Sequence, residues 1–547
     1  MFKYPTIEDE FVKLFNIMFD IKKILPCLLI IILVLEGCVS VEKYNEQQTD
    51  LRSVKGLTSD IEYAQHKLES LHPDLYHYIS KKDLEYKFDS LKSSLTKPMT
   101  SYDFYFKLSP VIASIKQGHT QTLPFTKRLK YKEKILVKKS GTSPLSQYDY
   151  ELFNDKLYIV KNNSTDSTIK TGTEVLSVNG IHPMEMISKY KNTFTSDGTN
   201  TTFFPRKLAK GFPRYLYYEI GIQDSVICQL KYNGTYRNIT LKRPVISTRT
   251  GITKLKETTA IDLKLQKKES QKRRLLGYDP LKKVYSKMLT FPVQDSSVAI
   301  MKINDFMKGN FRKFYKQSFR LMDSLHTKIF ILDLRDNGGG LIRDINTLYS
   351  YLADSSFHLI EKPVVTSKTS LWHFGYYTNH PFWLQAIQTL FLPVVVEINI
   401  FTFLKTRKGP DNKYRFAIRE SRLTHPSTDR FKGKVYVLIN GGSYSASCLL
   451  SSNLKGSKRA TFVGQETGGA DNGCVAGILP VRSLRASKVQ VRIGLLECKT
   501  PYTSLRDGRG IFPDVEITPS LEDRMSGNDP ELQWVLNDIH QNKKVSK

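Results

Sequence analysis

Short apolar strands alternate with helical segments between residues 298 and 463, and this alternation constrains the fold more than any other feature of the chain. The strands are continuous apolar runs, which are typical of strands buried on both faces, and the segments between them carry apolar residues at helical spacing. This order predicts an α/β core in which helices cover a mostly parallel sheet. The predicted strands are Val298–Ile303, Lys328–Leu334, Lys434–Ile439 and Thr461–Val463, and the predicted helices are Phe311–Leu325, Asp344–Leu352 and Ser445–Leu454.

The rest of the chain divides by composition into segments around this core. A chain of 547 residues is expected to hold several domains. Helical spacing of apolar residues predicts an N-terminal helical domain over 59–130, and short strands that end in a hairpin at Asn233-Gly234 predict a β-rich domain over 131–243. The other predicted segments are a tether at 39–58, a basic linker at 244–295, the core at 296–520 with an insert at 355–430, and a C-terminal helix and tail at 521–547.

The β-rich domain contains the stretch Gly172–Gly180, which reads GTEVLSVNG. This stretch resembles a segment of PDZ domains, although Glu174 stands where Asp is usual. The resemblance implies a PDZ-like domain that binds extended peptide by strand addition. The alternative is a β-rich domain of another kind.

The N-terminal region carries the features of an export signal. Lys22-Lys23 precede the apolar run Ile24–Leu35, and a small residue follows, so we expect a signal peptide over 1–38. The run is shorter than the roughly 20 residues that a transmembrane helix needs. A start at Met18 in place of Met1 would make the signal more compact.

The signal ends in Leu35-Glu36-Gly37-Cys38, which resembles a bacterial lipobox apart from Glu36. This resemblance implies that Cys38 carries a lipid and holds the exported protein at a membrane surface of the bacterial cell envelope. A plain signal peptide or an N-terminal anchor is the alternative.

The insert holds the strongly apolar stretch Phe382–Phe403, which Pro393 and Glu397 interrupt. We expect a buried or lid-forming segment here, and contact with a bilayer is the alternative.

The chain is strongly basic, with 82 Lys and Arg against 53 Asp and Glu and a formal net charge of +29. Such a charge is compatible with nucleic acid or anionic lipid as a partner. No nucleic-acid-binding module is recognisable, so we expect a generally basic surface and no nucleic acid partner. The six Cys form neither a CxxC pair nor a zinc-binding spacing, so no metal site or cofactor is predicted.

Two glycine-rich turns follow predicted core strands. In the first, Gly338, Gly339 and Gly340 allow positive φ and expose N–H groups that could hold an anion. In the second, a strand runs through Gly441-Gly442 into Ser445 at the start of a helix, where the helix N-terminus favours a developing negative charge. Taken singly, the first could be a structural turn, and in the second Ser443 or Ser445 could be only a helix cap.

Together with a third motif, these two turns match the sequence pattern of a known family. LDLRDNGGG at 332–340, VLINGGSYSA at 437–446 and VGQETGG at 463–469 resemble the C-terminal processing (tail-specific) serine peptidase family and its tricorn-like relatives. This resemblance implies a Clp-protease/crotonase-like α/β core beside a PDZ-like domain. It also implies that Ser445 is the nucleophile, with an oxyanion hole formed by the N–H of Ala446 and that of Gly338 or Gly339.

The general base separates two branches of this family. The tail-specific branch has a Lys where this chain has Ala470, so that base is absent from its usual place. The tricorn-like branch uses a His in a Gly-His-Thr/Ser segment, which Gln117-Gly118-His119-Thr120 matches, so the resemblance implies that His119 is the base. It further implies that Asp507, which stands where the family pattern has Glu, is the carboxylate that orients the imidazole. A displaced Ser–Lys dyad with Lys488 is the alternative.

These features together favour an exported serine endopeptidase that cleaves polypeptides through an acyl-enzyme. Two other functions remain open. A peptide-binding protein on a degenerate peptidase scaffold is favoured by the departures at Ala470 and Asp507. A serine hydrolase acting on other bonds is disfavoured, because the turn at 442–447 lacks the Gly-x-Ser-x-Gly pattern of α/β-hydrolases.

Overall fold

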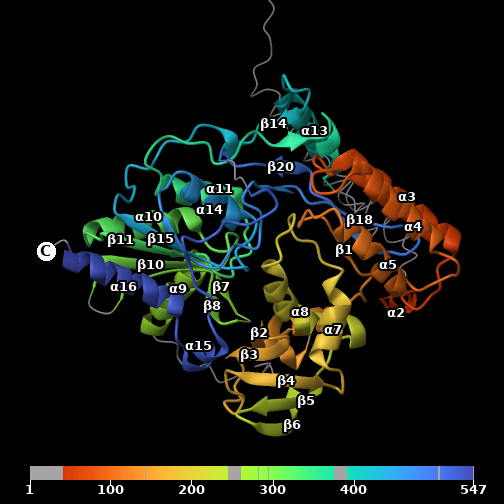
Figure 1. Ribbon diagram of the computed structural model, residues 1–547, viewed down its shortest axis with the longest axis horizontal. Helices are drawn as coiled ribbons and strands as arrows, with labels where there is room; N and C mark the ends of the chain where they lie inside the picture. Colours follow the sequence, from red (N-terminus) through yellow and green to blue (C-terminus); the bar gives the residue numbers. More distant parts are fainter. Residues whose placement is uncertain are drawn as a thin grey trace, which may run out of the picture.

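The computed structural model describes residues 41–141, 143–243, 260–280, 282–292, 295–374, 391–502 and 506–545. The predicted signal peptide and Cys38 lie outside the described residues. Figure 1 shows a core sheet with its helices on the left, a group of N-terminal helices at the upper right and an antiparallel sheet below. Among the described helices, none has both the length and the apolar character needed to cross a membrane.

The core sheet has six strands in the order β21-β16-β15-β11-β10-β9, and all neighbours are parallel except β9 and β10. This confirms the mostly parallel sheet. The strands are β9 (Lys287–Thr290), β10 (Val298–Ile303), β11 (Ile329–Asp333), β15 (Lys434–Ile439), β16 (Thr461–Gly464) and β21 (Val515–Glu516).

The core strands are apolar throughout because both faces of the sheet are covered. Along β11, Phe330 and Leu332 belong to the large core, whereas Ile331 belongs to a smaller cluster with Val535 and Ile539 of the C-terminal helix. Alternate side chains of a strand point to opposite faces, so helices cover both sides. The covering helices are α10 (Phe311–Ser324), α11 (Ile342–Ser350) and α14 (Ala446–Gly456) on one face, and α16 (Pro530–Val545), which follows the short α15 (Leu521–Ser526), on the other.

The N-terminal helices are α2 (Val41–Glu46), α3 (Val54–Leu71), α4 (Lys81–Ser93) and α5 (Ser101–Ala113). Side chains of Ser53, Ser80 and Thr100 accept hydrogen bonds from N–H groups in the first turns of α3, α4 and α5, which defines where these three helices begin. The prediction of a tether over 39–58 is wrong for residues 41–58. Helix α2 packs Tyr44 against Phe125, and α3 already begins within the predicted tether.

The β-rich segment forms a five-stranded antiparallel sheet in the order β2-β3-β4-β5-β6. Strands β5 and β6 pair around Asn233-Gly234, which confirms the hairpin. The elements are α6 (Tyr131–Ser140), η1 (Pro144–Gln147), β2 (Tyr148–Phe153), β3 (Lys156–Asn162), β4 (Thr173–Val178), α7 (Pro183–Lys191), α8 (Phe203–Ile220), β5 (Ser225–Tyr232) and β6 (Thr235–Lys242). Its PDZ-like character stays a prediction.

The predicted basic linker at 244–295 is wrong where the structure describes it. Residues 260–290 form α9 (Ala260–Leu276), the β7–β8 pair (Tyr278–Asp279 and Val284–Tyr285) and β9, an edge strand of the core sheet. The basic run therefore lies on α9, whose exposed surface carries Lys267, Lys268 and Lys272.

The insert contributes to a sheet in the order β13-β14-β12-β20-β17. Its elements are β12 (Val364–Val365), η2 (Ser370–His373), α13 (Leu392–Lys405), β13 (Thr406–Lys408), β14 (Tyr414–Phe416) and η3 (Arg419–Ser421), and they join β17 (Cys474–Ala476) and β20 (Leu496–Cys498). Of the two alternatives predicted for 382–403, a buried or a lid-forming segment, burial is wrong for the described part, because α13 lies exposed on the surface.

Candidate active site

Ser445 lies at the N-terminus of α14, directly after the turn that ends β15. Its backbone has φ 57° and ψ −118°, a conformation that L-residues rarely adopt. The neighbouring chain holds it there, because the carbonyl of Asn337 accepts hydrogen bonds from the N–H of Tyr444 and the hydroxyl of Ser447. The strained turn aims the Ser445 side chain outward from the end of the strand.

The two glycine-rich turns lie against each other. The Asn440 side-chain oxygen accepts hydrogen bonds from the N–H groups of Gly442 and of Asp336, at 2.9 Å each. The Ser443 hydroxyl donates to the carbonyl of Leu334. These bonds join the ends of two adjacent parallel strands, β11 and β15, and so bring together the two glycine-rich turns that the sequence singled out.

His119 reaches Ser445 through a strand pairing that links distant parts of the chain. Strand β1 (Gln121–Leu123) pairs with β19 (Gln490–Arg492), which in turn pairs with β18 (Val481–Ser483). The Arg492 side chain donates to the carbonyl of His119 at 2.9 Å. His119 Nε2 then lies 3.0 Å from Ser445 Oγ, across 326 residues of sequence.

The environment of His119 keeps its imidazole neutral. Burial, together with the smaller effects of the positive charges on Arg492 and Lys207, lowers the pKa of His119 to about 3. A neutral imidazole with its proton on Nδ1 presents Nε2 as an acceptor for the Ser445 hydroxyl. The pair therefore has the contact and the protonation state that a nucleophile and its base need.

The prediction that Asp507 orients His119 is wrong. Asp507 Oδ2 lies 2.8 Å from His77 Nε2, and Asn472 donates to Asp507 Oδ1. Within the described residues, His119 Nδ1 is buried without a hydrogen-bond partner. The physical reason is the anchoring of the loop after Asp507, in which Glu466 accepts hydrogen bonds from Arg509 and from the N–H of Gly510. This anchoring leaves the Asp507 carboxylate half exposed on the side of His77.

The predicted oxyanion donors behave differently from one another. The N–H of Gly339 donates to the Asn337 side-chain oxygen at 2.9 Å, so its assignment as a donor to substrate is wrong. In the part of the chain that the structure describes, the N–H groups of Gly338 and Ala446 donate to no protein acceptor. Gly339 instead allows the first glycine-rich turn to pack closely on the start of α14, because a Cβ there would lie 2.8 Å from the nitrogen of Ala446. Gly338 and Ala446 are the donors that remain.

Asp197 is a part of this site that sequence reasoning missed. Its buried carboxylate accepts hydrogen bonds from the N–H groups of Gly118 (2.7 Å) and Ala470 (3.3 Å), and burial raises its pKa. It thus joins the His119 segment to the segment after α14. In sequence, Asp197-Gly198 reads as an ordinary turn, and no pattern distinguishes it.

Lys207 of α8 was also missed. Its Nζ lies over the rings of Phe194 (5.1 Å) and Phe203 (4.9 Å), and burial lowers its pKa to about 7. No carboxylate pairs with it among the described residues. Lys488, the alternative base, lies at a positive φ in the turn before β19, where no described hydrogen bond joins it to Ser445.

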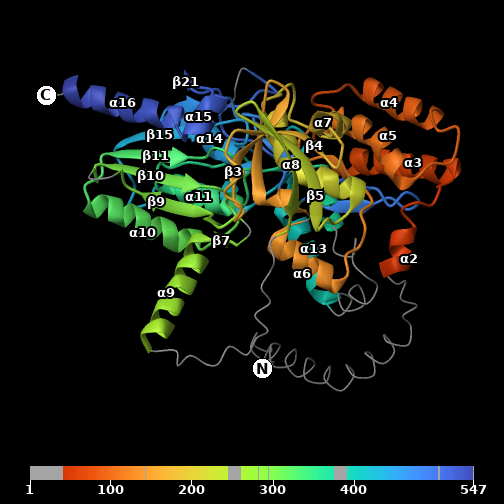
Figure 2. The same cartoon turned by 90° about the horizontal axis from the view of Figure 1, so that it is seen from below.

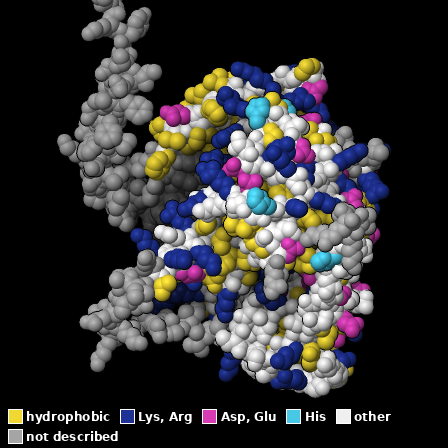
Figure 3. Space-filling model, turned by 90° about the vertical axis from the view of Figure 1, so that its left-hand side faces the viewer, with side chains coloured by type: hydrophobic (Ala, Val, Ile, Leu, Met, Phe, Trp, Pro, Cys, Tyr) yellow, Lys and Arg dark blue, Asp and Glu magenta, His cyan; other side chains and the backbone are white. Residues whose placement is uncertain are grey.

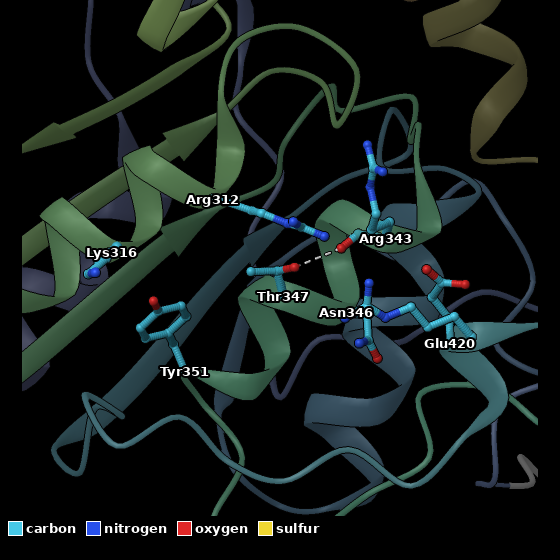
Figure 4. Close-up of a pocket in the computed structure, with 8 residues that line it drawn as sticks. Arg312, Lys316, Arg343, Asn346, Thr347, Tyr351 and Glu420 are labelled. Carbon is cyan, nitrogen blue, oxygen red and sulfur yellow. Dashed lines mark hydrogen bonds between the residues drawn. The ribbon is translucent and has the colours of Figure 1, made fainter. Parts of the chain in front are cut away.

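Other charged features lie away from Ser445 and His119. Figure 3 shows Lys and Arg widespread on the face that is at the left of Figure 1, with few acidic groups among them. A pocket of about 290 Å³ lies between α10 and α11, where Arg312 and Arg343 border it (Figure 4). It contains neither Ser445 nor His119. Among the described residues, no group of three or more His, Cys, Asp or Glu could hold a metal ion.

Comparisons with known proteins bear on the family and the fold. The family model described as Peptidase family S41 matches residues 297–517. The chain is 33% identical over 98 residues to a carboxy-terminal-processing protease of Bartonella bacilliformis. That match covers 18% of this chain and 21% of the relative, so it spans about a fifth of the relative's length.

Solved structures with a similar fold include mature CPAF and mature CPAF complexed with lactacystin. The first has a TM-score of 0.55 and 14% identity, covering 87% of this chain and 95% of that one. The second has a TM-score of 0.56 and 15% identity, covering 89% and 98%. At this identity the similarity shows the fold alone. The family itself is shown by the match of the family model. Residues 297–517 of this chain belong to peptidase family S41, a family of serine peptidases.

Proposed function

We propose that this protein is a serine endopeptidase in which Ser445 attacks a peptide carbonyl and His119 is the general base. The distance of 3.0 Å between His119 Nε2 and Ser445 Oγ is the observation that carries the proposal. Membership of the core in peptidase family S41 supports the same reaction class. The tricorn-like assignment rests on the use of His119 in place of a Lys.

The reaction follows from the positions of these groups. His119 takes the hydroxyl proton as Ser445 attacks, and it returns that proton to the leaving amine. The N–H groups of Ala446 and Gly338 stabilise the negative charge on the carbonyl oxygen, because they are already in place and donate to no acceptor in the described part of the chain. Water then hydrolyses the acyl-enzyme with His119 again as base.

A fluorophosphonate probe tests this proposal directly, because it reacts only with an activated serine. The full chain should be labelled at Ser445, and both Ser445→Ala and His119→Ala should prevent labelling. If the probe labels His119→Ala as strongly as the unmodified chain, His119 is not the base. Cleavage of unfolded protein substrates, with products identified by mass spectrometry, then separates a peptidase from a hydrolase that acts on other bonds.

A peptide-binding protein without turnover is a second candidate, and one observation favours it. Among the residues that the structure describes, none accepts a hydrogen bond from His119 Nδ1, where an acceptor would normally stabilise an imidazolium during catalysis. If this candidate is right, the unmodified chain should bind peptides without labelling or cleavage, and Ser445→Ala should bind them equally well.

We also propose that the protein is exported and held at a membrane surface through a lipid on Cys38, as the N-terminal pattern suggests. Cys38→Ala should release it from the membrane fraction of cells. Retention with unchanged processing of the precursor would reject lipidation at this residue. The sheet β2–β6 is proposed to bind extended peptide along an edge strand, β2 or β6.

A further inference from the structure

Helix α13 exposes more apolar surface than a water-facing helix normally does. Ile400, Phe401 and Leu404 are each more than half exposed, at 53%, 56% and 55%. Along the described helix and its first flanking residue, the large apolar side chains that lie exposed are Phe391, Leu392, Val394, Val396, Ile398, Ile400, Phe401 and Leu404. Only Val395 and Thr402 are buried.

The exposed residues occupy most of the circumference of the helix. Val395 and Thr402 lie two turns apart on one narrow face, and the apolar positions cover the remaining directions. Leaving this surface in water is unfavourable, because each fully buried aliphatic side chain gains about 1.5–3 kcal/mol over an exposed one. An occupant that covers this surface would therefore be stabilised by contact with it.

Basic residues border the same helix. Lys405 is in its last turn, and β13 continues directly with the exposed Arg407 and Lys408. Lys368 lies with its Nζ 4.6 Å from the ring centre of Phe403. Glu397 is the single acidic residue of the helix. A wide apolar face with cations at its border is typical of helices that lie in the interface of an anionic membrane.

Other basic elements lie on the same side of the molecule. In Figure 2, α13, α6, α9 and α2 lie toward the lower side, whereas α4 and α16 lie along the upper side. Helix α6 carries exposed lysines at 132, 134, 138 and 139, and α9 carries the basic run. Helix α2, which begins three residues after the predicted lipid site Cys38 in the sequence, lies on this side too.

From these observations we infer that α13 lies in the surface of an anionic lipid membrane, with its exposed apolar side chains among the lipid tails and the basic residues around it at the headgroups. A helix of 14 residues is about 21 Å long, which suits an in-plane position. The carboxylate of Glu397 limits the depth to the headgroup boundary. A second copy of the chain is a poorer occupant, because it would bring two basic borders together. The inference does not depend on catalysis by Ser445.

The first experiment reads the environment of α13 itself. In the full chain with Cys27→Ser and Cys38→Ser, Ile400→Cys carries an environment-sensitive fluorophore, and Tyr86→Cys on the opposite side carries the same dye as a control. Vesicles of phosphatidylglycerol and phosphatidylcholine should shift the emission of the dye at 400 to the blue and leave the dye at 86 unchanged. Phosphatidylcholine alone should shift it much less.

Three outcomes would overturn the inference. The dye at 400 could remain unchanged with anionic vesicles. It could report an apolar environment without lipid at every protein concentration, which would mean that the chain covers its own helix. It could do so only at high protein concentration, which would identify a second copy as the occupant.

The second experiment measures binding by vesicle flotation in the same background. Ile400→Gln with Phe401→Gln should weaken partitioning roughly tenfold, since two exposed apolar side chains are removed. Arg407→Gln with Lys408→Gln should weaken it by a factor of about five per charge and reduce its sensitivity to salt. Tyr86→Gln, which removes an exposed ring from α4, should leave partitioning unchanged. Equal binding by all three variants would reject the role of α13.

Discussion

The imidazole of His119 lies with its Nε2 3.0 Å from the Oγ of Ser445, and its other nitrogen is buried without a hydrogen-bond partner among the described residues. The site therefore has the contact that a nucleophile and its base would need, but within the described residues no third group binds the other ring nitrogen. In this chain, the Arg492 side chain donates a hydrogen bond to the main-chain carbonyl of His119, and the imidazole ring is buried. These two features orient the imidazole.

The pair should act as one catalytic unit. Ser445→Ala and His119→Ala should each lower kcat/KM for a peptide substrate by a factor on the order of 10³ or more, because each removes proton transfer from the attacking hydroxyl. The double variant should be little worse than either single variant. Steady-state kinetics on all three proteins test this, and additive losses would show that the two residues act independently.

Activity should persist into mildly acidic solution. The pKa of His119 is lowered to about 3, so the imidazole stays in its neutral, proton-accepting form well below the ordinary histidine value of about 6.5. The acid limb of kcat/KM against pH should thus lie below about pH 5. Burial favours the neutral ring in the folded protein, whereas the same imidazole takes up a proton in the unfolded chain below about pH 6.5. The free energy of unfolding therefore falls as the pH falls below that value. Circular dichroism must show that the protein is folded at each pH.

Lys207 provides a matched test of the same electrostatics. Its positive charge lowers the pKa of His119, so Lys207→Met should move the acid limb to higher pH. The change leaves the Ser445–His119 contact in place. An acid limb that does not move, or that moves to lower pH, would contradict the assigned charge effect.

The two acidic residues near the site should respond differently. Asp197→Asn removes one of the two acceptor oxygens that bind the N–H groups of Gly118 and Ala470, so kcat/KM should fall by about tenfold or more. Asp507→Asn should change it by less than about twofold, because Asp507 contacts His77 and Asn472 at the surface. A loss in Asp507→Asn as large as that of His119→Ala would show that Asp507 reaches the imidazole after all.

Adjacent glycines of the first turn form another matched pair. Gly339 has φ 95°, and a Cβ there would lie 2.7 Å from the carbonyl oxygen of Tyr444, so Gly339→Ala should displace Ser445 and lower both activity and stability, the latter by about 1–3 kcal/mol. Gly338 has open space around a Cβ and keeps its N–H, so Gly338→Ala should be nearly neutral for folding. Kinetics and thermal unfolding compare the two, and equal effects would contradict the packing of Gly339 on Ser445.

Much of the core could be predicted from sequence because its signals are local. The continuous apolar strands, the helical spacing between them and the glycine-rich turns all act within a few residues, and β10 and β15 have the predicted bounds. The position of Ser445 at the start of a helix follows from the same short-range pattern. The motif around His119 marked a candidate through its resemblance to a family, without evidence that it reaches Ser445.

Tertiary structure alone decided which distant groups meet. His119 reaches Ser445 because β1 pairs with β19, and a strand's partner is not encoded in its own periodicity. Asp507 fails to meet His119 because Glu466 holds the following loop. Asp197 binds the N–H of Gly118, which lies 79 residues before it, and the N–H of Ala470, which lies 273 residues after it. The apolar stretch that includes α13 predicted a buried or lid-forming segment, yet packing covers only a narrow face of this helix. Apolar periodicity states what a segment can bury, whereas the three-dimensional arrangement determines whether protein is present to cover it.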